Sequence, residues 1–78
     1  MQQINEYGSQ DHLDQLINEQ VAAGFLSHSV RTLQGWRVRG GGPRYVRVSG
    51  RSIRYRRRDL IAWAEQRIVN NTSEPTPN

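Results

Sequence analysis

The sequence predicts a mainly helical fold with one small β-hairpin, in the order helix, helix, two-stranded hairpin, helix. Apolar residues recur at helical spacing in three segments, and between the second and third segments the pattern changes to strict alternation, as in a strand. Glycine and proline separate these segments. With 78 residues, the chain has room for one small domain.

We expect the structured domain to span residues 16–69. Residues 1–15 contain scattered apolar residues without a sustained period, which predicts a flexible leader with one helical turn near Asp11 to Leu16. Residues 70–78 are polar and contain two prolines, so we expect a disordered tail.

The first helix is expected within "LINEQVAAGFL". Asn18 is a suitable N-cap, and Ile17 before it can pack on Ala22 as a hydrophobic staple. Ala22, Ala23 and Leu26 then share one face of a helix of about two turns.

The second helix follows at once, with Ser29 as its N-cap. Leu33 and Trp36, three residues apart, form its buried face. The residues that then face outward are Arg31, Gln34, Gly35 and Val38. Three glycines followed by Pro43 must end this helix.

The alternating segments predict a hairpin with an apolar face and a basic face. The valines of "RYVRV" share one face, as do the isoleucine and tyrosine of "SIRY", and we expect these faces to pack on the helices. Arg47 and Arg54 then face solvent, with Arg51 at the tip. Between the strands, Gly50 is free to take a positive φ angle and close a tight turn.

The last helix is expected in "RDLIAWAEQRIV", where it buries Leu60, Trp63 and Ala64. Two helices joined by a tight turn, then a hairpin and a third helix, form a winged helix-turn-helix.

Charge is distributed unevenly along the chain. Residues 1–30 contain four acids and no Lys or Arg, whereas residues 31–67 contain all eleven arginines against Asp59 and Glu65. A basic block beside an acidic leader indicates a polyanionic partner, most often nucleic acid. The planar guanidinium suits phosphate oxygens and guanine edges, although codon usage in a GC-rich genome explains the absence of lysine equally well.

Several classes of site are not expected. The chain has no cysteine, which excludes disulfides and thiolate metal sites, and His12 and His28 have no metal-site spacing. We expect no metal, no cofactor and no enzymatic activity, because adjacent His28 and Ser29 cannot face each other as a nucleophile pair. Without an apolar run long enough for a membrane span or signal peptide, we expect a soluble, cytoplasmic protein.

The second helix is predicted to bind double-stranded DNA. In a major groove, Arg pairs with guanine O6 and N7, and Gln pairs with adenine N6 and N7. Gly35 costs about 1 kcal/mol of helix propensity relative to Ala, which is explained if a phosphate or base edge approaches closely. The predicted contact residues are Ser29, Arg31, Thr32, Gln34, Gly35 and Arg37. The alternative is an ordinary helical hairpin with a solvated polar face.

The wing is predicted to form the second DNA contact, through Arg47, Arg51, Ser52 and Arg54. No acid lies in the hairpin to pair with these arginines, so we expect the tip to enter the minor groove or contact phosphates. The alternative is that the charges only protect an edge strand from aggregation.

Three consecutive arginines, Arg56 to Arg58, stand where the last helix begins, and cations there oppose the helix dipole. The arrangement becomes favourable if a phosphate binds at this helix N-terminus. We therefore predict phosphate contacts for Arg57 and Arg58, and also for Arg39 at the end of the second helix. Asp59 is placed to pair with one of these arginines.

These residues resemble the MerR-type winged helix-turn-helix of small excisionases and related phage or plasmid regulators. The matching features are the Ala22-Ala23 pair, "SVRTL", Trp36, Gly-Pro before the wing, "RY" before the last helix, and Trp63, and the resemblance covers about 55 of the 78 residues. Ser27 and His28 replace the usual glycine and small aliphatic residue of the turn. Ser27 must then accept a strained conformation, and His28 is expected to be half-buried.

The resemblance implies an excisionase, or recombination directionality factor, of a phage or integrative element. Copies would bind repeated sites head-to-tail in an attachment region, bend the DNA and direct a site-specific integrase toward excision. The long dimerisation helix of full MerR regulators is not expected here. Open alternatives are a stand-alone transcriptional regulator, the DNA-recognition module of a packaging complex, and an RNA-binding protein, which would carry stacking aromatics on its surface.

Overall fold

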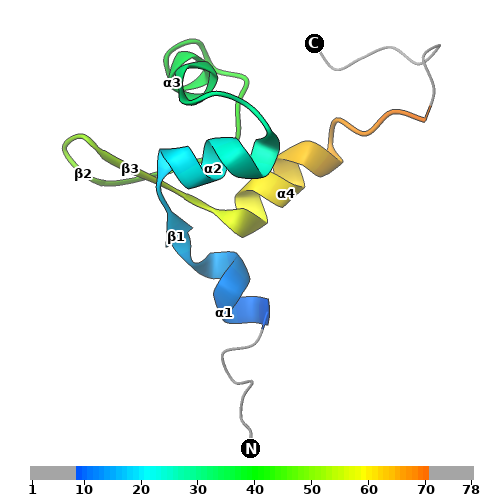
Figure 1. Ribbon diagram of the computed structural model, residues 1–78, viewed down its shortest axis with the longest axis horizontal. Coiled ribbons are helices and arrows are strands. Elements are labelled where there is room, and N and C mark those ends of the chain that lie inside the picture. Colours follow the sequence, from blue (N-terminus) through cyan, green and yellow to red (C-terminus); the bar gives the residue numbers. More distant parts are fainter. Residues whose placement is uncertain (1–8, 71–78) are drawn as a thin grey trace, which may run out of the picture.

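The computed structural model describes residues 9–70, which form four helices and a small antiparallel sheet (Figure 1). The elements, in chain order, are α1 (Ser9–Asp14), β1 (Leu16–Ile17), α2 (Glu19–Leu26), α3 (Val30–Arg39), β2 (Val46–Ser49), β3 (Ser52–Arg56) and α4 (Arg57–Glu65). Helices α2 and α3 are the helix-turn-helix, and the β2–β3 hairpin projects as a wing. The predicted winged helix-turn-helix fold is confirmed.

Both predicted helix caps are present. The Asn18 side chain accepts a hydrogen bond from the Val21 N–H at 2.8 Å, and Ser29 Oγ accepts one from the Thr32 N–H at 3.1 Å. Each cap satisfies a backbone donor that the first helical turn leaves unpaired. The boundaries of α2 and α3 therefore follow from local sequence.

The turn between α2 and α3 depends on Ser27, which has a left-handed backbone conformation (φ 58°, ψ 41°). Its N–H bonds to the Gly24 carbonyl at 3.1 Å, and the His28 N–H bonds to the Ala23 carbonyl at 2.8 Å. These two bonds are a Schellman motif, which usually has glycine at the left-handed position. Ser27 thus has the strained conformation that we predicted, whereas His28 is exposed rather than half-buried, with its ring edge against Trp36.

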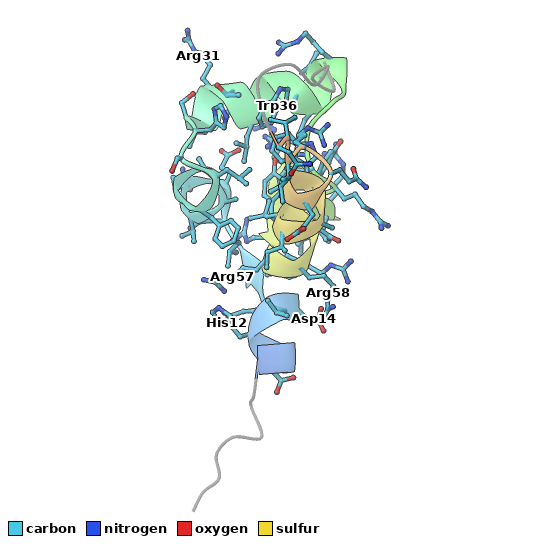
Figure 2. The ribbon with its side chains drawn as sticks, turned by 90° about the vertical axis from the view of Figure 1, so that its right-hand side faces the viewer. His12, Asp14, Arg31, Trp36, Arg57 and Arg58 are labelled. Carbon is cyan, nitrogen blue, oxygen red and sulfur yellow. The ribbon has the colours of Figure 1, made fainter. Side chains whose placement is uncertain are left out.

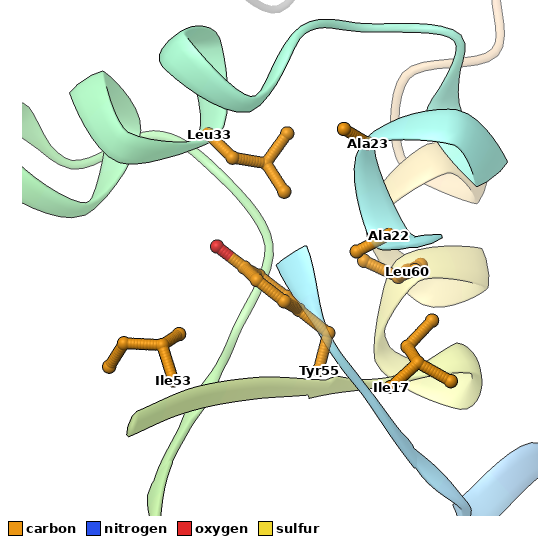
Figure 3. Close-up of a cluster of buried hydrophobic side chains, with 7 residues drawn as sticks. All are labelled: Ile17, Ala22, Ala23, Leu33, Ile53, Tyr55 and Leu60. Atoms are coloured by element: carbon orange, nitrogen blue, oxygen red, sulfur yellow. The ribbon is translucent and has the colours of Figure 1, made fainter. Parts of the chain in front are cut away.

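The core lies between α2, α3, α4 and the sheet, and Tyr55 stands at its centre (Figure 3). Tyr55, Leu33 and Leu60 are the largest fully buried side chains. The other buried apolar residues are Ile17, Ala22, Ala23 and Ile53. The prediction for α4 is correct at Leu60 and wrong at Ala64, which is exposed because α4 presents that side to solvent.

The sheet has three strands, in the order β1-β3-β2, rather than the two strands predicted. In β1, Leu16 pairs with Arg56 and Ile17 pairs with Tyr55. Ile17, expected only as a staple on α2, therefore lies in a strand whose inward side chain reaches the core, 7% exposed. Two residues are too few to show an alternating pattern, so this strand left no signal in the sequence.

The register of the wing corrects the predicted faces. Val46 pairs with Arg54 and Arg47 pairs with Ile53, and residues directly opposite in an antiparallel ladder share a face. Arg47 thus lies on the face of Ile53, whereas Val46 shares the face of Arg54. The cause is a register shift between Arg47 and Ser49, a β-bulge that inserts one residue and reverses the alternation. Gly50 also differs, because its φ is not positive.

The end of the predicted leader is helical, and this helix overlaps the single helical turn that we expected near Asp11 to Leu16 but begins earlier and ends at Asp14. Residues Ser9–Asp14 form α1, which packs against α4 (Figure 1). Residues 1–8, the rest of the predicted leader, and residues 71–78 of the predicted tail lie outside the described part of the chain.

Candidate nucleic-acid interface

The outer face of α3 exposes the side chains that we predicted to read bases. Arg31, Gln34 and Val38 are exposed, and Val38 is 87% exposed. Figure 2 shows Arg31 extending from one end of the molecule. Its guanidinium forms no hydrogen bond or ion pair with any residue in the range 9–70. This face of α3 therefore presents an unpaired guanidinium, an amide and an apolar side chain, all of which can contact base edges in a major groove.

Ser29 and Thr32 lie at the N-terminus of α3, where the prediction placed them. Their hydroxyl oxygens are 3.0 Å apart and hydrogen-bonded. The first turn of a helix also has backbone N–H groups without intrahelical partners, and these attract anions. This end of α3 therefore has the donors that a flanking phosphate needs.

Arg37 has a structural role, in contrast to the predicted position near a flanking phosphate. Its side chain is 18% exposed. Nη1 donates to the Tyr55 hydroxyl at 2.8 Å, and Nη2 donates to the Glu19 carboxylate at 3.0 Å. The guanidinium therefore joins α3 to the core and to α2.

Gly35 is half-buried beneath the side chain of Arg39. A Cβ atom at Gly35 would lie 2.8 Å from Arg39 Nη1. The glycine therefore leaves room for this guanidinium, and the close approach of a phosphate or base edge stays a prediction. Arg39 is exposed above it, at the end of α3 where we predicted a phosphate contact.

The arginines of the wing differ in their hydrogen-bond partners. Arg51 is exposed at the tip, and within the described residues it has no hydrogen-bond partner. Arg47 donates to the Gly50 carbonyl at 2.8 Å and so braces the turn, while Arg54 donates to the Ile53 carbonyl at 2.9 Å. Ser52 is half-buried and pairs with Ser49. Backbone carbonyls carry no net charge, so these bonds leave the positive charge of the wing uncompensated.

A groove of about 130 Å³ connects the wing with the helix-turn-helix. It lies between the N-terminus of α2 and strand β3, and its lining includes Asn18, Glu19, Arg37, Arg51 and Arg54. Arg51 and Arg54 face the positive end of the α2 dipole across it. The groove therefore brings wing arginines and residues of the helix pair to one place on the surface.

Within this surface, ion pairing is sparse. Arg37 in α3 and Arg56 at the end of β3 are the only arginines of α3 and the hairpin that pair with a carboxylate in the described part of the chain. Unpaired cations on one helix face and on an adjacent hairpin are what a polyanionic duplex requires.

The match to a known family agrees with this geometry. Residues 16–68 match the family model of the helix-turn-helix domain, from β1 to beyond the end of α4. The chain belongs to the helix-turn-helix domain family. This family includes excisionase-like proteins, and membership supports sequence-specific binding of double-stranded DNA. No curated protein matches the chain significantly.

In this helix-turn-helix domain, the arginines at the start of α4 are already paired. Arg56 donates to both carboxylate oxygens of Asp59, at 2.8 and 3.0 Å. This confirms the prediction that Asp59 pairs with one of the three arginines. Arg57 donates to Gln15 Oε1 at 3.1 Å, and Arg58 donates to Asp14 Oδ1 at 2.5 Å. Within the chain, Arg57 and Arg58 therefore already contact the end of α1 and the residue after it, and their predicted phosphate contacts stay a prediction.

The Arg58–Asp14 pair also lies far from the recognition helix. Figure 2 shows Arg31 at one end of the molecule, and Arg57, Arg58 and Asp14 toward the other end. The hydrogen bond from Arg58 lowers the pKa of Asp14 below its ordinary value, because it stabilises the charged carboxylate. The two groups of predicted contact residues thus do not form one site.

Sequence reasoning missed two acids that organise the helix-turn-helix domain. Asp14 neutralises Arg58, and Glu19 bonds both Arg37 and Gln34. Both lie in the acidic N-terminal part of the chain, which we connected only with an external partner. An acidic segment and a basic segment of one chain can also pair with each other. The uneven distribution of charge along the sequence could therefore have predicted these internal contacts.

Residues 9–70 contain no group of three or more His, Cys, Asp or Glu side chains that could hold a metal ion. No helix in this range is long and apolar enough to cross a membrane.

Proposed function

We propose that this protein is a sequence-specific DNA-binding protein without catalytic activity, and that it acts as an excisionase. The observation that carries the DNA-binding part is the distribution of unpaired guanidinium groups. They lie on α3 and the wing, whereas the arginines at the start of α4 are paired within the chain.

In the proposed complex, α3 enters the major groove. Arg31 donates to guanine O6 and N7, and Gln34 contacts an adenine. Arg51 at the wing tip and Arg54 beside the groove contact the backbone or the adjacent minor groove. Ser29, Thr32 and Arg39 lie close to flanking phosphates at the two ends of α3.

As an excisionase, the protein would also contact neighbouring copies of itself and a site-specific integrase. Copies bind directly repeated sites in an attachment region, contact one another head-to-tail and bend the DNA, and a site-specific integrase then assembles for excision in the cytoplasm of a bacterial host. Two things support this role: the family includes excisionase-like proteins, and the residues from Ala22 to Trp63 resemble the small excisionases.

The experiment is a gel shift and footprint on the DNA that flanks the gene, across a salt series. We expect a ladder of complexes on direct repeats, with phased bending. Contacts to about four phosphates give a slope of log K against log salt of about −3.6. The absence of duplex binding would contradict the proposal, because the arginine surface would then serve another polyanion.

A stand-alone transcriptional regulator uses the same surface and is the second candidate. It predicts one complex on a palindromic site overlapping a promoter, and a stable dimer in solution. An RNA-binding role is less well supported, because the two tryptophans pack against each other, with ring centroids 5.0 Å apart, and are not presented for stacking on bases.

A further inference from the structure

We infer that Glu19 is a positioning residue that fixes the orientation of the Gln34 amide and so selects the base that α3 accepts. Glu19 lies on α2, outside the recognition helix, and sequence analysis gave it no role in binding. The inference rests on the proposed function, because it requires Gln34 to face base edges in a major groove.

The Glu19 carboxylate holds two residues of α3 at once. Its Oε2 accepts a hydrogen bond from Gln34 Nε2 at 3.3 Å, and its Oε1 accepts one from Arg37 Nη2 at 3.0 Å. Arg37 is itself held by the hydroxyl of Tyr55, which is 1% exposed. A chain of contacts thus runs from the centre of the core to the amide on the outer face of α3.

The chemistry of the carboxylate decides which way the amide points. An ionised carboxylate only accepts hydrogen bonds, so Gln34 must turn its nitrogen toward Glu19. The flipped amide would place its carbonyl oxygen against a negative charge. One N–H of Gln34 is used by Glu19, and the second N–H and the carbonyl oxygen remain for a base.

One donor beside one acceptor suits adenine, which presents N7 as an acceptor and the N6 amine as a donor. Guanine presents two acceptors, N7 and O6, so the fixed carbonyl oxygen of Gln34 would face O6 without a proton between them. An amide released from Glu19 can rotate and donate to guanine. Glu19 therefore favours adenine over guanine at one position of the site.

The test measures base preference at every position of the bound site, for the wild type, Glu19→Ala, Gln34→Ala and the double variant. We expect Glu19→Ala to reduce the preference for adenine over guanine at one position by about fivefold or more. In the Gln34→Ala background, Glu19→Ala should not change this preference. Glu65→Ala is the matched control, because it removes an exposed acid from α4 and so changes the net charge equally.

A second variant separates a change in base preference from a loss of stability, because Glu19→Ala also removes the partner of Arg37. Glu19→Gln keeps the side-chain length and can still accept from Arg37, but its amide can donate as well as accept, so both orientations of Gln34 become possible. We expect the same loss of base preference, with thermal unfolding close to that of the wild type.

Two outcomes would overturn the inference. If Glu19→Ala and Glu19→Gln keep the adenine preference while Gln34→Ala loses it, Gln34 reads the base without Glu19. If Gln34→Ala changes no position, Gln34 reads no base and the inference fails with that part of the proposed function. Salt-dependent duplex binding by the same variant would show that the rest of the proposed function stands.

Discussion

Arginine residues close together in this sequence have different roles, and their neighbours decide which role each one has. Arg37 bonds a buried tyrosine and an acid, whereas Arg31, six residues earlier, has no partner in the described part of the chain. The helical period predicted that Arg31 faces outward. It did not show that Arg37 would meet Glu19, because that contact depends on how α2 packs against α3.

Arg31→Ala should reduce sequence discrimination, because it removes a candidate contact with a guanine edge. We expect the preference for the cognate base over the others at one position to fall by about 1–3 kcal/mol. Competition binding with single-base variants of the site measures this loss.

Arg54→Ala is the matched variant on the wing. It should weaken binding to all duplexes and flatten the salt dependence by about one unit of slope, because a phosphate contact carries no sequence information. An equal loss of specificity in the two variants would contradict this division of roles.

Ser27→Gly should stabilise the protein, because Ser27 occupies the left-handed position of the turn between α2 and α3. Glycine takes this conformation without a Cβ clash, and we expect the free energy of unfolding to rise by about 0.5–1 kcal/mol. Urea unfolding followed by circular dichroism measures the change. Ser49→Gly, in strand β2, should destabilise, so stabilisation by both variants would argue against a local backbone effect.

At the scale of elements, the boundaries that depend on local signals were predicted well. The caps of α2 and α3 and the buried face of β3 follow from residues within a few positions of each other. Strand β1, helix α1 and the register of β2 could not be predicted, because they depend on partners distant in the sequence or on a bulge. The same limit applies to the site, where the face of α3 was predictable and the pairing of Arg58 was not.

Gly24→Ala should stabilise α2. Gly24 lies inside this helix, and a Cβ atom there would meet nothing within 4 Å. The higher helix propensity of alanine should raise the free energy of unfolding by about 0.5–1 kcal/mol, measured in urea.

Gly42→Ala is the contrasting variant, in the loop between α3 and the wing. Its Cβ would lie 2.6 Å from Trp36 Cβ, so the loop must shift, and we expect a loss of about 1–3 kcal/mol. If Gly42→Ala is neutral, the loop can move away from Trp36 at little cost.

On the scale of the whole molecule, charge is sorted into two regions. The acids of the N-terminal part neutralise the start of α4 and hold Arg37, and the arginines of α3 and the wing remain largely without acidic partners. The sequence predicted phosphate contacts at the start of the last helix as well as contacts on α3 and the wing. The fold separates these two groups of arginines, because α1 and the residue after it contact Arg57 and Arg58.

Docking of α1 should weaken in acid. The pKa of Asp14 lies below its ordinary value of 3.8 because Arg58 donates to it, so the stabilisation is present above pH 3.8 and is lost as the pH falls through the lowered value. We expect the amide chemical shifts of residues 9–14 to stay constant near neutral pH and to move toward random-coil values below pH 3.8.

Asp14→Asn should show this loss at every pH, because the amide carries no charge to pair with Arg58. Asp11→Asn, in the same helix, is the control and should behave as the wild type. A wild-type α1 that stays docked in strong acid would show that apolar packing on α4, rather than the ion pair, holds it.

The contact between α3 and α4 gives the protein an optical probe of its own. Trp36 and Trp63, the two tryptophans of the chain, meet there, and the Arg67 guanidinium lies 4.2 Å from the centre of the Trp63 ring. Indole emission and the indole bands of the near-ultraviolet circular dichroism therefore both report on this one junction. A spectrum that is unchanged when α3 engages a ligand means that the helix binds as a rigid body, and a changed spectrum means that it shifts against α4.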